Sequence, residues 1–157
     1  MILVDTSVLI DFLKGSENDF VSLFDEILDM RIPYGINEFI YQEILQCSKN
    51  ITEFNRLKKY FETVVFSHLK NEKKSYKDAA FIHFSCRRAC ITIRSTIDLL
   101  IAQTAIENNL YLFHKDEDFN QIARVVPRLK IFLKTICSNC FRAPLSIIMP
   151  DRQSVNP

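Results

Sequence analysis

Four acidic side chains lie at positions where a simple solvated charge is unexpected. Asp5 directly follows the apolar run ILV at 2–4, and Asp116 lies just beyond the run LYLF at 110–113. Glu43 and Asp98 fall within apolar helical patterns. Because a buried and unpaired carboxylate is costly, each of the four needs either a structural role or a positively charged partner.

Structural roles are available for three of these acids. Asp5 can cap a helix that begins one or two residues later. The spacing Ser95-x-x-Asp98 resembles a capping box, with Asp in place of Glu or Gln. Asp116 begins the acidic run DED, which the helix dipole favours at the start of a helix. Taken singly, each of these acids can therefore be explained without any chemistry.

Glu43 is harder to explain as a solvated residue. In GINEFIYQEILQC, Asn37 is a good N-cap, and the helix that follows places one acid in an apolar stripe. The stripe consists of Ile36, Phe39, Ile40, Glu43, Ile44 and Cys47. A solvated Glu belongs on the opposite face of such a helix. Either the edge of the stripe is wet at Glu43, or Glu43 points inward and has a partner.

Short apolar runs typical of strands alternate with helical patterns. The expected strands cover 2–5, 32–34, 64–66, 110–113 and 129–132. The expected helices cover 7–14, 17–29, 37–48, 52–62, 72–89, 96–108 and 117–124. Such alternation predicts an α/β fold with a mainly parallel sheet of four or five strands, covered by helices on both faces. The carboxyl ends of parallel strands share one edge of the sheet, which is where ligands bind in open α/β folds.

Four carboxylates gathered at that edge would repel one another and would need cations. Hard oxygen ligands, without a nearby Cys or paired His, favour Mg²⁺ or Mn²⁺ over zinc. In-line cleavage of a phosphodiester uses such a cluster to activate water and to stabilise the leaving oxygen. No Gly-rich phosphate loop competes for the role, because Gly15 and Gly35 are isolated.

Over roughly residues 1–133 the chain resembles the PIN domain, and within that family the VapC-type toxins. Four segments carry the resemblance in the order of the family motifs: ILVDTSVLIDFLKG, INEFIYQEIL, STIDLLIAQTA and LYLFHKDEDF. They assign the acids Asp5, Glu43, Asp98 and Asp116, with Ser7 and Asp118 as accessory candidates. Asn37 and His114 differ from the Thr or Ser common at their positions, but neither difference removes a metal ligand.

The resemblance implies a PIN-like three-layer αβα sandwich and a Mg²⁺-dependent (or Mn²⁺-dependent) endoribonuclease, the toxin of a type II toxin–antitoxin pair. Asp5, Glu43 and Asp98 would be the core metal ligands, and Asp116 would complete the cluster. The expected substrate is structured RNA, such as tRNA or rRNA. A small VapB-like antitoxin is the expected partner, and a homodimer is the expected assembly. Two alternatives stay open: a PIN nuclease of RNA processing or decay without an antitoxin, and a catalytically idle PIN-like binding module.

Carboxylates repel phosphate, so RNA would need cations around the acidic site. Lys14, Arg94 and Lys115 are the candidates nearest to the four acidic motifs. A further run, formed by Lys70, Lys73, Lys74 and Lys77, is either a solvated helix face or an additional contact. Residues 1–123 carry 14 basic and 18 acidic residues, whereas residues 124–157 carry 6 and 1. The basic end is either solvated or a weak contact for a polyanion.

Neither a signal peptide nor a membrane span is expected, so we expect a cytoplasmic protein with reduced cysteines. A zinc site built from Cys86, Cys90, Cys137 and Cys140 is disfavoured against buried or idle thiols. Residues 134–157 lack a clear period, and we expect them to be an extension of unknown role on a domain of residues 1–133.

Overall fold

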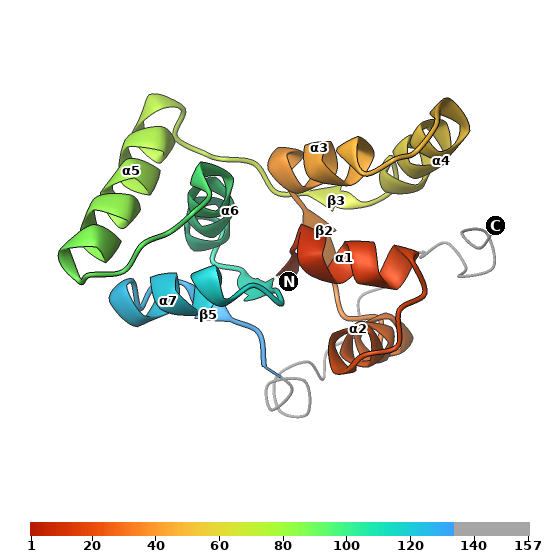
Figure 1. The fold of residues 1–157 in the computed structure, drawn as a ribbon, viewed down its shortest axis with the longest axis horizontal. Coiled ribbons are helices and arrows are strands. Elements are labelled where there is room, and N and C mark those ends of the chain that lie inside the picture. The colour runs from red at the N-terminus through yellow and green to blue at the C-terminus, as the bar shows by residue number, and fades with distance from the viewer. Residues whose placement is uncertain (134–157) are drawn as a thin grey trace.

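The structure is a computed structural model that describes residues 1–133. Within these residues five strands form one parallel sheet in the order β3-β2-β1-β4-β5 (Figure 1). The strands are β1 (Ile2–Val4), β2 (Tyr34–Ile36), β3 (Val65–Phe66), β4 (Tyr111–Phe113) and β5 (Lys130–Ile131). The helices are α1 (Thr6–Leu13), α2 (Asp19–Asp29), α3 (Glu38–Gln46), α4 (Ile51–Phe61), α5 (Lys73–Arg88), α6 (Thr96–Glu107) and α7 (Glu117–Val125). The predicted α/β fold is confirmed, with five strands.

The second strand lies two residues later than the sequence predicted. The expected strand at 32–34 is instead β2 at Tyr34–Ile36. The ladder begins where the amide of Ile2 donates to the carbonyl of Pro33, and it continues through Gly35, which pairs with both β1 and β3. A Cβ on Gly35 would meet the backbone oxygen of Val65 at 2.5 Å. Glycine is a weak strand former, so local sequence does not favour it inside a strand. It is required at position 35 because β3 approaches too closely for a side chain.

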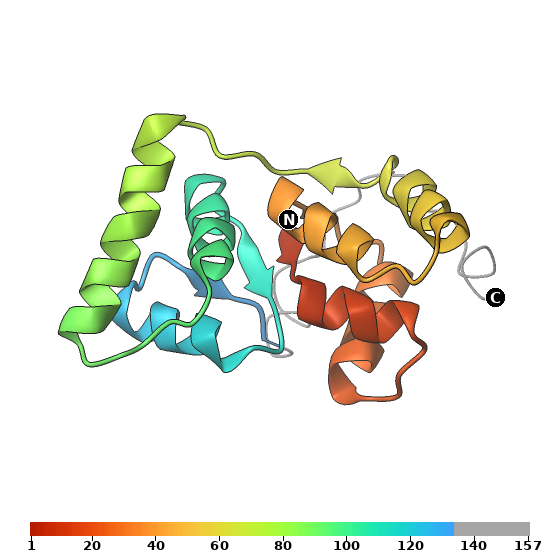
Figure 2. The ribbon, with the colours of Figure 1, turned by 45° about the horizontal axis from the view of Figure 1, so that its top comes forward.

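The core is built around β1 and the helix α6. All three residues of β1 are buried, as expected for a central parallel strand covered on both faces. Ala102 and Ala105 on α6 are fully buried, and their small side chains let this helix pack closely. Helix α5 packs against α6 and α7 at one end of the molecule, and α4 lies at the other end (Figure 2).

The strand order has its switch point between β1 and β4. From β1 the chain moves to β2 and β3 on one side, and it later returns to β4 and β5 on the other side. In open α/β sheets ligands bind at the carboxyl ends of the strands at such a point. Asp5 follows β1 there, and Asp116 lies a few residues after β4.

Three cysteines fall within residues 1–133, and all are free: Cys86 is buried, whereas Cys47 and Cys90 are exposed. Cys137 and Cys140 lie outside the described residues, as does the whole predicted extension 134–157. No helix in the described part of the chain combines the length and the apolar character that crossing a bilayer requires.

Candidate active site

Asp5 both caps a helix and lines the site. Its Oδ2 accepts hydrogen bonds from the amide of Ser7 at 2.9 Å and from the hydroxyl of Ser7 at 2.6 Å, which caps α1. Only 5% of Asp5 is exposed. Burial raises the pKa of Asp5, the bonds from Ser7 oppose that rise, and the negative charge of Glu43 adds to it. Asp5 can therefore cap the helix and also take part in the site.

Glu43 points inward and has a partner. The hydroxyl of Thr6 donates a 2.6 Å hydrogen bond to Oε2 of Glu43, joining α1 to α3. Ile40 and Ile44 are buried beside it, but Cys47 is exposed, so the predicted apolar stripe was wrong at that position. Helix α3 ends at Gln46, and Cys47 is its C-cap residue. Sequence reasoning missed Thr6, because only the fold brings this hydroxyl to Glu43.

Asn37 ties together the two helices that carry Glu43 and Asp98. Its side chain is fully buried and caps α3 by accepting from the amide of Ile40 at 2.9 Å, which confirms the predicted N-cap. Its Nδ2 donates to the hydroxyl of Thr104 on α6 at 3.1 Å. Both the oxygen and the nitrogen of this buried side-chain amide thus have hydrogen-bond partners. Together these bonds fix α3 against α6.

Asp98 lies at the start of α6 and is exposed to the charges of other acids of the site. Ser95 caps the helix by accepting from the amides of Ile97 and Asp98, which confirms the predicted cap. Burial raises the pKa of Asp98 to about 7, and the negative charges of Asp5 and Asp116 add to that rise. The carboxylates are therefore close enough to oppose each other's ionisation.

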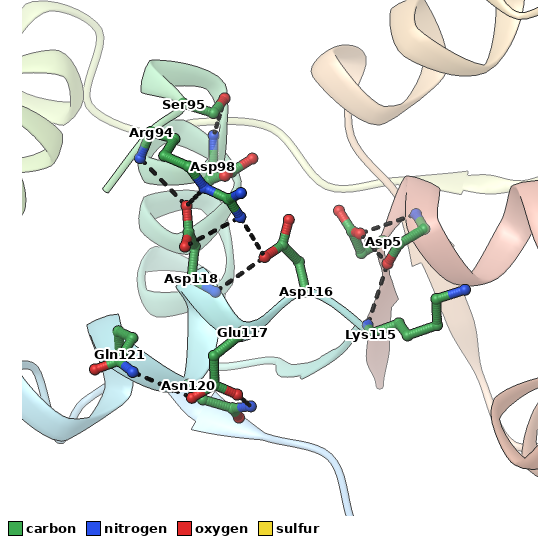
Figure 3. Close-up of polar contacts among 11 residues, drawn as sticks. Asp5, Arg94, Ser95, Asp98, Lys115, Asp116, Glu117, Asp118, Asn120 and Gln121 are labelled. Carbon is green, nitrogen blue, oxygen red and sulfur yellow. Dashed lines mark hydrogen bonds and ion pairs between the residues drawn. The ribbon is translucent and has the colours of Figure 1, made fainter. Parts of the chain in front are cut away.

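Asp116 and Asp118 share one cation (Figure 3). Asp116 caps α7 by accepting from the amide of Asp118 at 3.0 Å. The guanidinium of Arg94 pairs with Asp116 at 3.4 Å and with Asp118 at 3.2 Å. Asp118 also accepts from the backbone amide of Arg94, and only 7% of it is exposed. Asp118 thus anchors the loop before α6, a role that the sequence did not indicate.

The two predicted lysines both lie next to α1: Lys14 is its C-cap residue, and Lys115 contacts its side chains. The amide of Lys115 donates to the hydroxyl of Ser7 at 3.1 Å, so the loop after β4 is fastened next to Asp5 (Figure 3). The ammonium group of Lys115 pairs with Asp11. Lys14 is exposed at the end of α1 and lines a small pocket that borders the site, since Ile10 and Cys47 line both.

The four predicted acids line one open cleft of about 430 Å³ at the carboxyl edge of β1 and β4. Its walls are formed by Asp5, Thr6, Ser7, Ile10, Glu43, Gln46, Cys47, Asp98, Asp116 and Phe119. Asp118 is not among these residues, and Arg94 reaches the cleft only through its pair with Asp116. One cleft therefore contains acids from four segments that are far apart in the sequence.

The donor set of this cleft suits a hard divalent cation. All four acids offer oxygen, and among residues 1–133 no Lys or Arg forms an ion pair with Asp5, Glu43 or Asp98. In the described part of the chain, no three His, Cys, Asp or Glu side chains converge as a ready metal-binding group. Like charges in one cleft repel one another, and a bound cation would relieve that repulsion. The assignment of the ligands remains a prediction.

Comparison with known proteins places residues 2–125 in the PIN domain family. A VapC ribonuclease of Mycobacterium bovis is 28% identical over 126 residues, covering 80% of this chain and 93% of the relative. Ribonuclease VapC11 of Mycobacterium tuberculosis matches with the same identity and coverage.

Solved structures share the fold. The crystal structure of VapBC2 from Rickettsia felis, bound to a promoter DNA fragment, superposes with a TM-score of 0.64 at 16% identity, covering 84% of this chain and 98% of that one. The structure of VapBC-1 from nontypeable Haemophilus influenzae gives 0.63 at 20% identity, with 84% and 97% covered. FitAcB from Neisseria gonorrhoeae gives 0.62 at 18% identity, with 85% and 97% covered. These likenesses confirm the PIN-like αβα sandwich.

Proposed function

This chain belongs to the PIN domain family, and we propose that it is a metal-dependent endoribonuclease, the toxin of a type II toxin–antitoxin pair acting in the cytoplasm. One observation carries the proposal: four carboxylates, one directly after β1, one from α3, one from α6 and one from the loop after β4, line a single cleft at the switch point of the sheet. The ribonuclease names of the VapC relatives support the same reaction.

In this proposal Asp5, Glu43 and Asp98 hold Mg²⁺ or Mn²⁺, and Asp116 completes the cluster. When bound, such a cation supplies a Lewis acid that stabilises charge on the phosphate and lowers the pKa of the attacking water. The chain itself prepares the ligands, because hydroxyls restrain two of them before any metal arrives. Ser7 holds Oδ2 of Asp5, and Thr6 holds Oε2 of Glu43. Asp118 acts as an accessory residue by keeping Arg94 beside Asp116.

The reaction is tested by sequencing the 5′ ends of tRNA and rRNA after incubation with purified protein and Mg²⁺ or Mn²⁺. We expect new 5′-phosphate ends at discrete positions with the wild type, and none with Asp5→Asn or after chelation. Asp29→Asn, an exposed acid on α2, is the matched control and should cleave normally. If the wild type cleaves no RNA with either metal, the idle binding module is the better explanation.

The antitoxin is tested by expression. We propose a small partner whose Arg or Lys enters the acidic cleft, since a partner's cation could replace the metal there. Structures of VapBC and FitAB complexes share this chain's fold, which supports such a partner. Expression of the chain alone should arrest growth, and co-expression of a small adjacent gene product should relieve the arrest. An active protein that is harmless by itself would favour a nuclease of RNA processing or decay.

We further propose that Lys14, Arg94 and Lys115 contact the phosphates of RNA at the rim. Arg94 has the strongest support, because its guanidinium borders Asp116 and its side chain is 74% exposed. Replacing Arg94 by Ala should lower the salt dependence of RNA binding by about one phosphate contact, a slope change of about 0.7 for single strands. An unchanged slope in the Lys14, Arg94 and Lys115 variants would mean that RNA enters by another face.

A further inference from the structure

Helix α5 exposes three aromatic side chains that no packing within the domain explains. Tyr76 is 55% exposed, Phe81 is 64% exposed and Phe84 is 47% exposed. The rings of Phe81 and Phe84 stack with their centroids 5.9 Å apart. The opposite side of α5 makes the contacts with the core, through Ser75, Ala79, Ile82 and Cys86. A cluster of exposed aromatic rings on one helix is typical of an interaction surface.

Positive charge is interleaved with these rings on the same face. Lys73, Lys77, Arg87 and Arg88 are all exposed, and helical spacing places them alongside Phe84. The guanidinium of Arg88 lies 5.9 Å from the centroid of the Phe84 ring. Within the described residues none of the four forms an ion pair, whereas the neighbouring Lys74 is paired with Asp78.

The charge of α5 contrasts with that of the other residues between 1 and 123. The helix carries five basic residues and one acid, a net charge of +4. Residues 1–123 carry 14 basic and 18 acidic residues, a net charge of −4, so without α5 they carry −8. Helix α5 is thus a basic element within an otherwise acidic stretch of the chain, which favours a polyanionic partner.

We propose that this outer face of α5, defined by Lys73, Tyr76, Lys77, Phe81, Phe84, Arg87 and Arg88, is a platform on which unpaired bases of RNA stack. The inference rests on the proposed ribonuclease function and adds the place where the substrate is held. Exposed rings offer stacking surfaces to any base, and the interleaved cations contact the phosphates. A second copy of the chain suits the face less well, because a twofold contact would set two faces of like charge against each other.

The position of α5 connects the platform to the acidic cleft. Helix α5 lies outside α6 and packs against both α6 and α7 (Figures 1 and 2). Its last residue, Arg88, leads through a short loop to Arg94 and to Ser95, the cap of α6. Six residue steps span at most about 20 Å from Arg88 to Arg94, so cations continue from the platform toward Asp98.

The test is binding of a fluorescent 12-nucleotide oligouridine in a chelating buffer, where cleavage is blocked. We expect Phe81→Ala and Phe84→Ala each to weaken binding about fivefold or more, since each stacked base contributes substantially. Phe84→Tyr keeps a ring and should bind normally. Lys77→Gln should reduce the salt slope by about 0.7. A 12-base-pair RNA duplex should bind less tightly than the single strand and should be insensitive to the aromatic substitutions.

Matched controls come from α4. Ile51 is an exposed apolar residue and Lys59 an exposed lysine, so Ile51→Ala and Lys59→Gln should bind the oligouridine like the wild type. Equal binding by the wild type and the two Phe→Ala variants would overturn the platform. So would a change from dimer to monomer in these variants at unchanged RNA affinity, measured by light scattering, because α5 would then be an interface between copies.

The two proposals fail in different ways. If wild-type protein cleaves RNA with Mg²⁺ or Mn²⁺ while the aromatic variants bind and cleave normally, the ribonuclease stands and the platform is wrong. If no RNA is cleaved but the aromatic variants lose oligouridine binding, the platform stands on a protein that binds RNA without cutting it.

Discussion

At the scale of single residues, burial and neighbouring charges both act on Asp98 in the cleft. Its pKa is raised to about 7, so the folded state favours the protonated acid. The stability that this preference contributes is complete below the pKa of the unfolded chain, 3.8, and is lost as pH rises through about 7. Above that pH, the metal-free protein contains an ionised Asp98 in surroundings that favour the protonated form.

Asp98→Asn should therefore stabilise the metal-free protein in a pH-dependent way. The amide imitates the protonated acid, so we expect a higher Tm than the wild type at pH 8 and about the same Tm at pH 4. The gain at pH 8 should be on the order of 1 kcal/mol, because solvent partly screens this half-buried group. Calorimetry in a chelating buffer measures it, with the exposed Glu17→Gln as control. A difference independent of pH would contradict the assigned cause.

Thr6 is a positioning residue for Glu43, which gives a second prediction at this scale. Thr6→Val keeps the shape but removes the donor to Glu43, so the carboxylate loses its restraint. We expect the metal concentration for half-maximal RNA cleavage to rise about tenfold, as for other groups that orient metal ligands. The loss of stability should be only about 1 kcal/mol. Thr6→Ser restores the hydroxyl and should restore the metal response; equal impairment of both variants would refute this role.

At the scale of elements, Asn37 joins the start of α3 to the middle of α6. Asn37→Ala removes both the cap and the bond to Thr104, at a cost of about 1–3 kcal/mol. Asn37→Ser should recover part of this loss, because serine can cap the helix but cannot reach across to α6. The urea midpoint measures the effect.

Asn50→Ala is the matched control for this element. Asn50 caps α4 by the same geometry but is exposed and makes no bond to α6. It should cost only about 1 kcal/mol and leave RNA cleavage unchanged. If the two alanine variants are equally destabilised, the buried amide contributes no more than an ordinary cap.

At the scale of the whole molecule, the proposed cation should stabilise the folded state through the acidic cleft. A ligand that binds only the folded state at 100 times its Kd stabilises it by about 2.7 kcal/mol. Saturating Mg²⁺ or Mn²⁺ should thus raise the Tm of the wild type, and the rise should shrink in Asp5→Asn while Asp29→Asn keeps it. Thermal melts with and without metal decide the matter, and an equal rise in wild type and Asp5→Asn would remove Asp5 from the ligands.

The sequence by itself determined most of the elements and the identity of the four acids. Apolar periodicity and capping residues act within a few positions, so the helix starts at Asn37 and Ser95 could be predicted. Matching motifs in the family order indicated Asp5, Glu43, Asp98 and Asp116. The prediction was wrong where pairing between strands overrides local preference, as at Gly35, which the approach of β3 places inside a strand.

Only the tertiary structure decided how the acids are held. Thr6 and Glu43 are 37 positions apart, and Arg94 and Asp118 are 24 apart, so no local pattern could reveal their contacts. The raised pKa of Asp98 likewise depends on burial and on the charges of Asp5 and Asp116, which follow β1 and β4. Chain folding sets these distances, and electrostatic and hydrogen-bond energies depend on distance and burial rather than on order along the chain.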